Sequence, residues 1–288
     1  MDIMLLDINE GVTKTGSPYL YGKVALPEGV QLPFKSWGIS LDSFPYKSAD
    51  CLEVDGVISQ YAGSDQLVIE EVKGGSLLPT SAFYKRNPKK QDWSEYFDGV
   101  VNTLPTPHRT LMKIIYANPN VKSFRDEWAA ATHHDAIDGG LMWHSFKVAY
   151  YMDRLFKLNP GLSEKVDRDM MIMGALLHDL GKVWEYKNGI PVVEGLAISH
   201  RVLLIEWLTD NYRLDFITLF GGGEEGERKW YRLLGMISQH HGEFEERPRT
   251  IEGMMLHLCD NFEAQTTALV EGIMSGNYPI KLSGFILN

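Results

Sequence analysis

The stretch Met170–Lys182 constrains the fold more than any other part of the chain. Its first part, Met170–Leu177, is apolar on every side, which indicates a buried helix too short to span a bilayer. The run then ends in His178-Asp179, and Gly181 follows as a helix stop. Because burying an unpaired carboxylate costs on the order of several kcal/mol, Asp179 needs a partner. A metal ion that also binds His178 is one such partner. The alternative is a capping or ion-paired aspartate beside a core histidine.

The composition of the 288-residue chain is typical of a globular protein with one large or two modest domains. Its two cysteines, Cys51 and Cys259, lie far apart, which favours the reducing cytoplasm over a disulfide framework. No segment has the length and hydrophobicity of a membrane span or a signal peptide, so we expect no membrane association. The net charge of −10 argues against broad electrostatic coating of nucleic acid, although a local basic channel could hold a short strand.

Residues 1–78 are predicted to form a small β-barrel of the OB-like kind. The candidate strands are residues 19–26, 32–39, 52–61 and 66–72, which are rich in β-branched and aromatic residues. Short strands in close succession, without a helical period, favour such a barrel. Barrels of this kind often bind single strands through exposed aromatic and basic side chains. The candidates for that platform are Tyr19, Tyr21, Phe34 and Trp37, unless they are simply core residues.

Residues 79–107 are predicted to link two domains, because prolines recur through the segment. The segment also holds the densest basic patch of the chain. The candidate substrate contacts in this patch are Lys85, Arg86, Lys89 and Lys90. Basic residues interleaved with aromatic ones can hold a phosphate backbone and stack bases. The alternative is a solvated linker whose lysine stems cover apolar surface.

From residue 108 to 288 the hydrophobic period becomes helical. The candidate helices are residues 109–116, 122–132, 142–158, 168–180, 200–211, 229–240 and 251–274. The predicted fold class is therefore α+β and multidomain, with a small N-terminal β-barrel followed by an all-α domain.

Several histidines and aspartates of the helical half stand beside strongly apolar residues, as inward-facing groups would. They are His144, His178, Asp179, His200, His240, His241 and Asp260. Imidazole and carboxylate groups that converge from several helices favour Mn²⁺, Fe²⁺, Ni²⁺ or Mg²⁺ over a tetrahedral structural Zn²⁺. Any single histidine could instead be a satisfied core or surface residue, but the ordered set is hard to explain in that way.

This order of residues resembles the HD-domain metal-dependent phosphohydrolases, with His144, His178-Asp179 and Asp260 in the corresponding positions. It is also similar to the YhaM-like 3′–5′ exoribonucleases, which join an N-terminal OB fold to a C-terminal HD domain. The motifs that carry this similarity are Gly139-Gly140-Leu141-x-x-His144, Leu177-His178-Asp179-Leu180-Gly181-Lys182, Ser199-His200, His240-His241-Gly242 and Leu256-His257-Leu258-Cys259-Asp260-Asn261. The resemblance spans nearly the whole chain.

The resemblance implies two divalent ions, with Mn²⁺ first and Fe²⁺, Ni²⁺, Mg²⁺ or Zn²⁺ as alternatives. The implied ligands are His144, His178, Asp179 and Asp260 for one ion, and His200, His240 and His241 for the other, with Asp179 bridging. Such a pair supports two-metal phosphoryl transfer. Asp179 and Lys182 are the implied catalytic residues. Lys182 would contact a phosphate oxygen, or else it would act as a cation at the end of a helix.

Members of the family often carry a His-His pair shortly before the Gly-Gly. Here His134 and Asp135 occupy the corresponding positions, and His133 is displaced. Despite this departure from the family pattern, His134 is a candidate substrate contact.

The first functional hypothesis is a di-metal phosphodiesterase that trims single-stranded RNA or DNA from the 3′ end. An alternative is the same centre acting on a nucleotide, a cyclic dinucleotide or another small phosphoester, because the metal centre alone does not determine the substrate. A third hypothesis is a non-enzymatic adaptor with a structural metal. The expected partner is a single-stranded nucleic acid or a small phosphoester. The resemblance also leaves room for a homo-oligomer.

Overall fold

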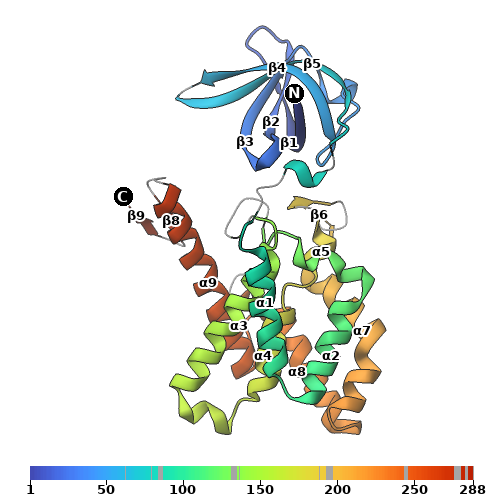
Figure 1. Cartoon of the computed structure of the whole chain (residues 1–288), viewed down its shortest axis with the longest axis vertical. Coiled ribbons are helices and arrows are strands. Elements are labelled where there is room, and N and C mark those ends of the chain that lie inside the picture. Colours follow the sequence, from blue (N-terminus) through green and yellow to red (C-terminus); the bar gives the residue numbers. More distant parts are fainter. Residues whose placement is uncertain are drawn as a thin grey trace. The chain divides into compact units, whose positions relative to one another are not determined.

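The computed structural model describes residues 1–61, 63–78, 80–83, 87–130, 135, 137–187, 189–192, 197–242, 246–275, 280–282 and 285–287. The chain separates into two compact units, Met1–Asn87 and Pro88–Asn288. Figure 1 shows the first unit as blue and cyan strands and the second as helices coloured from green to red. Each unit has its own cluster of buried apolar side chains.

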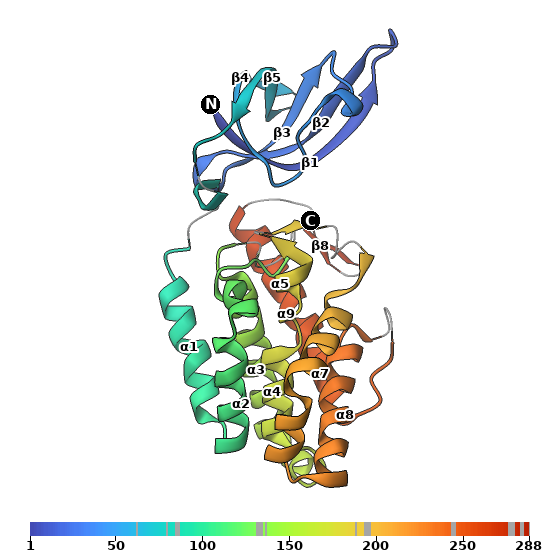
Figure 2. The ribbon, with the colours of Figure 1, turned by 90° about the vertical axis from the view of Figure 1, so that its right-hand side faces the viewer.

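The strands of the first unit close into a barrel in the order β1-β2-β3-β5-β4 (Figure 2). They are β1 (Asp2–Val12), β2 (Pro18–Ala25), β3 (Gln31–Trp37), β4 (Cys51–Tyr61) and β5 (Ser64–Gly75). Strands β3 and β5 pair in parallel, and the other neighbouring strands pair antiparallel. Short 3₁₀ helices are η1 (Pro27–Gly29), η2 (Leu41–Ser43) and η3 (Thr80–Phe83). The predicted OB-like barrel is confirmed.

Alternation along β3 separates two of the aromatic residues that the sequence grouped together. Phe34 is buried in the barrel core, whereas Trp37 is 52% exposed. Side chains alternate between the two faces of a strand, so residues three apart point to opposite sides. Phe34 therefore packs inside the barrel and cannot belong to an outer platform.

The second unit is helical, and its helices lie alongside one another in both views (Figures 1 and 2). They are α1 (Lys90–Thr103), α2 (Thr106–Ala117), α3 (Gly140–Leu158), α4 (Arg168–Leu177), α5 (Lys182–Glu185), α7 (His200–Leu219), α8 (Gly223–Gln239) and α9 (Ile251–Ser275). Smaller elements are the 3₁₀ helices η4 (Pro119–Arg125) and η5 (Pro160–Glu164), and the strands β6 (Tyr186–Lys187), β7 (Ile190–Pro191), β8 (Ile280–Leu282) and β9 (Phe285–Leu287). Among the residues described, no helix combines the length and hydrophobicity needed to cross a membrane.

The segment predicted as a linker, residues 79–107, contains the whole of α1 and the start of α2. The prolines that suggested a linker lie before α1 and at the start of α2, where proline is tolerated because no intrahelical partner is lost. Both helices belong to the second unit, whose boundary falls after Asn87.

Helix α4 is the centre of the second unit. Every residue from Met170 to Leu177 is buried, as the apolar run predicted. The side chain of Asp167 accepts a hydrogen bond from the Met170 amide at 3.1 Å and caps the helix. Helix α4 packs against α2, α3, α8 and α9. Its C-terminal end therefore delivers His178 and Asp179 into the middle of the bundle.

Candidate metal centre

The structure brings together all seven histidines and aspartates that the sequence singled out as metal ligands. His144 lies on α3, His178 and Asp179 follow α4, His200 begins α7, His240 and His241 follow α8, and Asp260 lies on α9. Among the described residues, ligand atoms within 4.8 Å of one another form three groups made up of these seven residues: His144, His178 and Asp260; His200, His240 and His241; and His178, Asp179 and His240. A fourth group consists of Asp135, His144 and Glu263. Residues more than a hundred positions apart therefore share one site.

Asp179 lies between two groups of imidazoles and presents one carboxylate oxygen to each. Its Oδ2 lies 3.4 Å from His144 Nε2 and 3.5 Å from His178 Nε2. Its Oδ1 lies 3.2 Å from His200 Nε2 and 3.4 Å from His240 Nε2. Each oxygen of Asp179 therefore faces its own pair of imidazole nitrogens.

The remaining ligands complete one group each. Asp260 Oδ1 lies 3.1 Å from His144 Nε2 and 3.8 Å from His178 Nε2. The ring of His241 lies 5.2 Å from that of His200, measured between centroids. We call the group of His144, His178 and Asp260 site 1, and the group of His200, His240 and His241 site 2, with Asp179 common to both.

The Nδ1 atoms of four histidines are held away from the centre. His178 Nδ1 lies 2.7 Å from the Ala175 carbonyl oxygen, and His240 Nδ1 lies 2.8 Å from the Ile237 carbonyl oxygen. The carboxylates of Glu263 and Glu185 fill the same place for His144 and His200. When Nδ1 of a neutral imidazole donates its hydrogen in this way, the lone pair resides on Nε2, which faces Asp179.

Buried atoms at the centre test whether these residues fit a metal. His178 Nε2, His200 Nε2, His240 Nε2 and Asp179 Oδ1 are buried and form no hydrogen bond within the described part of the chain. Buried polar atoms are normally hydrogen-bonded, so several orphans facing one point call for a shared partner. Imidazole nitrogens and carboxylate oxygens are ligands of divalent transition metals. The residues present fit a metal centre.

Electrostatics at the centre keep the carboxylates ionised. Burial opposes ionisation of Asp179, but Lys182 and His178 outweigh it and hold its pKa well below the ordinary value. Burial likewise opposes ionisation of Asp260, and hydrogen bonding to His144 outweighs it, so that its pKa is also held well below the ordinary value. Burial lowers the pKa of His240 to about 4, so its imidazole is neutral at pH 7. The site therefore combines ionised carboxylates with a neutral nitrogen donor.

The Lys182 ammonium lies at the centre, where its contacts are with groups of the protein itself. Its Nζ is 2.7 Å from Asp179 Oδ2 and donates a hydrogen bond to the Ala129 carbonyl oxygen at 2.8 Å. Its side chain is only 14% exposed. In this position the ammonium orients the shared carboxylate, and a phosphate contact by Lys182 stays a prediction.

Of the candidate substrate contacts outside the centre, only Lys89 and Lys90 are among the described residues. Lys85, Arg86 and His134 lie outside the described residues. Lys89 is exposed and immediately precedes α1. Lys90 begins α1, and its ammonium pairs with Asp126 and with Asp138 rather than facing the metal ligands.

Three residues around the centre were not predicted as site residues from the sequence: Glu263 and His257, which are buried, and Glu185, which is partly exposed. Glu263 and Glu185 accept from the ligand imidazoles, and His257 Nδ1 lies 2.9 Å from the His240 carbonyl oxygen. Glu263 follows Asp260 by three positions, which places both on one face of α9. That spacing is a signal that could have identified Glu263.

The barrel carries an exposed aromatic face on strands β2, β3 and β4. Tyr19 pairs with Trp37 across β2 and β3, and Tyr21 pairs with Lys35. The Tyr19 and Trp37 rings are 4.9 Å apart, and Lys35 Nζ lies 5.4 Å from the Trp37 ring and 4.7 Å from the Tyr61 ring. Tyr21, Trp37 and Tyr61 are all more than 40% exposed. We call Tyr19, Tyr21, Lys35, Trp37 and Tyr61 the aromatic face.

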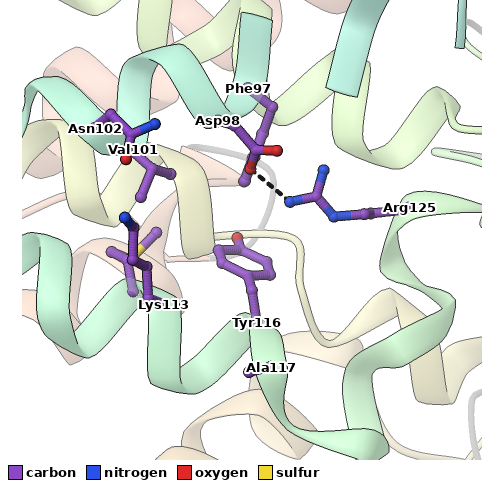
Figure 3. Close-up of a pocket in the computed structure, with 9 residues that line it drawn as sticks. Phe97, Asp98, Val101, Asn102, Lys113, Tyr116, Ala117 and Arg125 are labelled. Atoms are coloured by element: carbon purple, nitrogen blue, oxygen red, sulfur yellow. Dashed lines mark hydrogen bonds and ion pairs between the residues drawn. The ribbon is translucent and has the colours of Figure 1, made fainter. Parts of the chain in front are cut away.

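A separate cavity of about 420 Å³ lies among α1, α2 and η4. Figure 3 shows Tyr116 in its middle and the ion pair between Arg125 and Asp98 beside it. The Tyr116 hydroxyl donates a hydrogen bond to the Leu176 carbonyl oxygen at 2.5 Å. None of the candidate metal ligands lines this cavity, whose walls are formed by residues such as Phe97, Val101 and Met112. The cavity is therefore distinct from the metal centre.

Comparison with known proteins agrees with the predicted helical domain. Residues 142–265 match the family model of the HD domain, and this segment carries all seven candidate ligands. Residues 142–265 therefore form an HD domain, and the protein is a metal-dependent hydrolase.

A relative of known function covers nearly the whole chain. It is the 3′-5′ exoribonuclease YhaM of Geobacillus sp. (strain WCH70), which is 26% identical over 279 residues, or 92% of this chain and 82% of the relative. The chain is thus similar to this exoribonuclease over most of its length and to the HD domain over residues 142–265, as the motifs had indicated. No solved structure matches the chain.

Proposed function

We propose that this protein is a di-metal phosphodiesterase that removes nucleotides from the 3′ end of single-stranded RNA or DNA. The observation that carries the proposal is the position of Asp179, whose two oxygens face two separate groups of imidazoles. A carboxylate shared in this way supports two ions rather than one.

The residues of the centre divide the chemical work. When bound, two divalent ions supply a nucleophilic water of lowered pKa and neutralise the phosphate oxygens. Asp179 ties the two sites together, and Lys182 fixes the orientation of its carboxylate through Oδ2. The Nδ1 contacts of His178 and His240 to backbone carbonyls fix the ring orientations before any substrate arrives.

A single-stranded polymer is the substrate that two further observations favour. The relative that matches 92% of the chain is a 3′-5′ exoribonuclease by name. The aromatic face of the barrel offers exposed Tyr and Trp rings with the Lys35 ammonium among them. Aromatic rings with nearby cations suit stacked bases and a phosphate backbone, whereas a mononucleotide would need no such face.

Hydrolysis of 5′-labelled single-stranded RNA and of its DNA counterpart, with Mn²⁺ and with chelator, tests the proposal. The wild-type protein should give a metal-dependent ladder that shortens from the 3′ end. Asp179→Asn should abolish the ladder because the amide keeps only one oxygen and no negative charge, so it cannot serve both groups. Asp169→Asn is the matched control, since Asp169 pairs with Arg168 at the start of α4, away from the centre.

Two other results would overturn the proposal. Hydrolysis of mononucleotides or cyclic dinucleotides without any oligonucleotide ladder would assign the centre to small phosphoesters. Tight metal binding without hydrolysis of any phosphoester, together with loss of folding in Asp179→Asn, would assign the metal a structural role.

A further inference from the structure

We propose that Glu263 and Glu185 are positioning residues that act on different metal sites, Glu263 on site 1 through His144 and Glu185 on site 2 through His200. This inference rests on the proposed function, because it assumes two ions at the centre. It adds that each ion depends on its own carboxylate outside the ligand set.

The four Nδ1 contacts show a regular division between the two sites. In site 1, Nδ1 of His178 contacts the Ala175 carbonyl, and Nδ1 of His144 contacts the Glu263 carboxylate. In site 2, His240 uses the Ile237 carbonyl and His200 uses the Glu185 carboxylate at 2.5 Å. Each site therefore has one histidine fixed by its own helix end and one fixed by a distant acidic side chain.

The two kinds of contact have different consequences for a metal ion. A carbonyl three residues back is set by the helix and fixes only the tautomer and the ring orientation. A carboxylate does this too, and its negative charge also makes the ligand nitrogen more basic. The metal affinity of each site should therefore depend on its acidic partner, Glu263 or Glu185.

Glu263 can position His144 firmly, because both of its carboxylate oxygens have partners in the protein. The residue is fully buried, and its Oε2 contacts His144 Nδ1. Its Oε1 accepts a hydrogen bond from the Thr267 hydroxyl at 2.6 Å and pairs with the Lys147 ammonium. Lys147 is in turn held by Asp135 at 2.9 Å. An ion pair serving packing alone would not require the second oxygen to face a ligand imidazole.

Glu185 occupies the equivalent place at the end of the short helix α5. Its side chain is 18% exposed, whereas that of Glu263 is fully buried. Water can partly replace a hydrogen-bond partner at an exposed position. We therefore expect the loss of Glu263 to weaken its site more than the loss of Glu185 weakens the other.

Calorimetric titration with Mn²⁺ tests the assignment without reference to activity. Wild type should bind two ions, and Glu263→Gln and Glu185→Gln should each weaken one ion by about 10–100-fold. Backgrounds that retain a single site identify which ion is affected. In His144→Asn, where site 2 remains, Glu185→Gln should weaken the remaining ion by about 10-fold or more, and Glu263→Gln should have little effect. In His241→Asn, where site 1 remains, the two effects should exchange.

Glu252→Gln is the control for a buried carboxylate lost from α9. Glu252 is 2% exposed and pairs with Arg232, and it contacts none of the candidate ligands in the described contacts. It should leave both ions bound even if it lowers the melting temperature.

The outcomes separate this inference from the proposed function. If Glu263→Gln and Glu185→Gln weaken the same ion, or if neither changes binding, the assignment is wrong while the two-ion centre stands. If Glu252→Gln weakens binding as much, the effect is a loss of stability and the assignment is again wrong. Wild type that binds no Mn²⁺ would contradict the two-ion centre itself.

Discussion

Replacing Gly181 by alanine should damage site 2 without unfolding the protein. Gly181 has φ −62° and ψ −16°, a helical conformation that any residue can adopt. Its requirement is space, because an added Cβ would lie 2.0 Å from the His200 carbonyl oxygen and 3.0 Å from Leu204 Cβ. The glycine therefore allows the start of α7 to approach the turn that carries Asp179.

The size of the effect follows from that distance. A carbon and a carbonyl oxygen in contact are normally at least about 3.3 Å apart, so the start of α7 must move by about 1.3 Å. His200 is the first residue of α7 and a candidate ligand of site 2. A misplacement of about 1 Å at a reacting centre can cost about 10²-fold in rate. We expect a loss of that order in Gly181→Ala, together with weaker binding of one Mn²⁺ ion.

Initial rates on labelled single-stranded RNA, Mn²⁺ titration and thermal melting would measure these effects. Gly99→Ala is the control, since Gly99 lies on the exposed side of α1 with no atom within 4 Å of the added Cβ. That variant should gain up to about 1 kcal/mol from helix propensity and keep wild-type activity. A Gly181→Ala protein with wild-type rate and two ions of unchanged affinity would refute the reasoning.

Three further predictions concern other parts of the chain. Burial lowers the pKa of His108, so the stability that its neutral ring contributes is present above the unfolded pKa of about 6.5 and is lost as the pH falls below it. In urea unfolding at pH 7.5 and 5.5, the free energy of unfolding of His108→Phe should therefore rise relative to that of wild type by up to about 1.4 kcal/mol per pH unit. Trp37→Ala should cost about 1–3 kcal/mol of oligonucleotide binding and leave hydrolysis of a small phosphodiester unchanged, and equal losses on both substrates would argue against the aromatic face. Lys147→Met should destabilise the fold by about 3–5 kcal/mol in urea, because it leaves the buried carboxylates of Asp135 and Glu263 without their cation, and a loss below about 1 kcal/mol would contradict this.

The candidate ligands could be predicted because each has a local signal. His178 and Asp179 end a helix that is otherwise wholly apolar, and a polar pair at such a place needs a partner. His200 and His240 lie at the ends of periodic segments. The common order of these residues in one protein class then suggested that they converge, and the structure brings them together.

The surroundings of the ligands could not be predicted in the same way. Glu185 contacts His200 from the end of α5, 15 positions earlier in the chain, and no periodicity relates the two positions. Its role depends on how α7 packs, which is a tertiary feature. Glu263 had a signal in its spacing from Asp260, but acidic residues on helices are common and the spacing alone does not distinguish a buried one.

Tertiary contacts also override local pattern in the segment 122–132, which was predicted to be an α-helix. The chain instead forms the 3₁₀ helix η4, which ends at Arg125. Beyond it, the side chain of Glu127 is buried and accepts hydrogen bonds from the Trp128 amide at 3.1 Å and the distant Gly189 amide at 2.7 Å. A contact across 62 positions cannot be read from a helical period.

The most direct test of the account is an anomalous difference map from crystals soaked in Mn²⁺. The account predicts two peaks on either side of Asp179, one beside His144 and His178 and the other beside His200 and His240. Asp179→Asn should lose at least one of them. A single peak, or Mn²⁺ bound away from Asp179, would contradict a centre in which one carboxylate serves two ions.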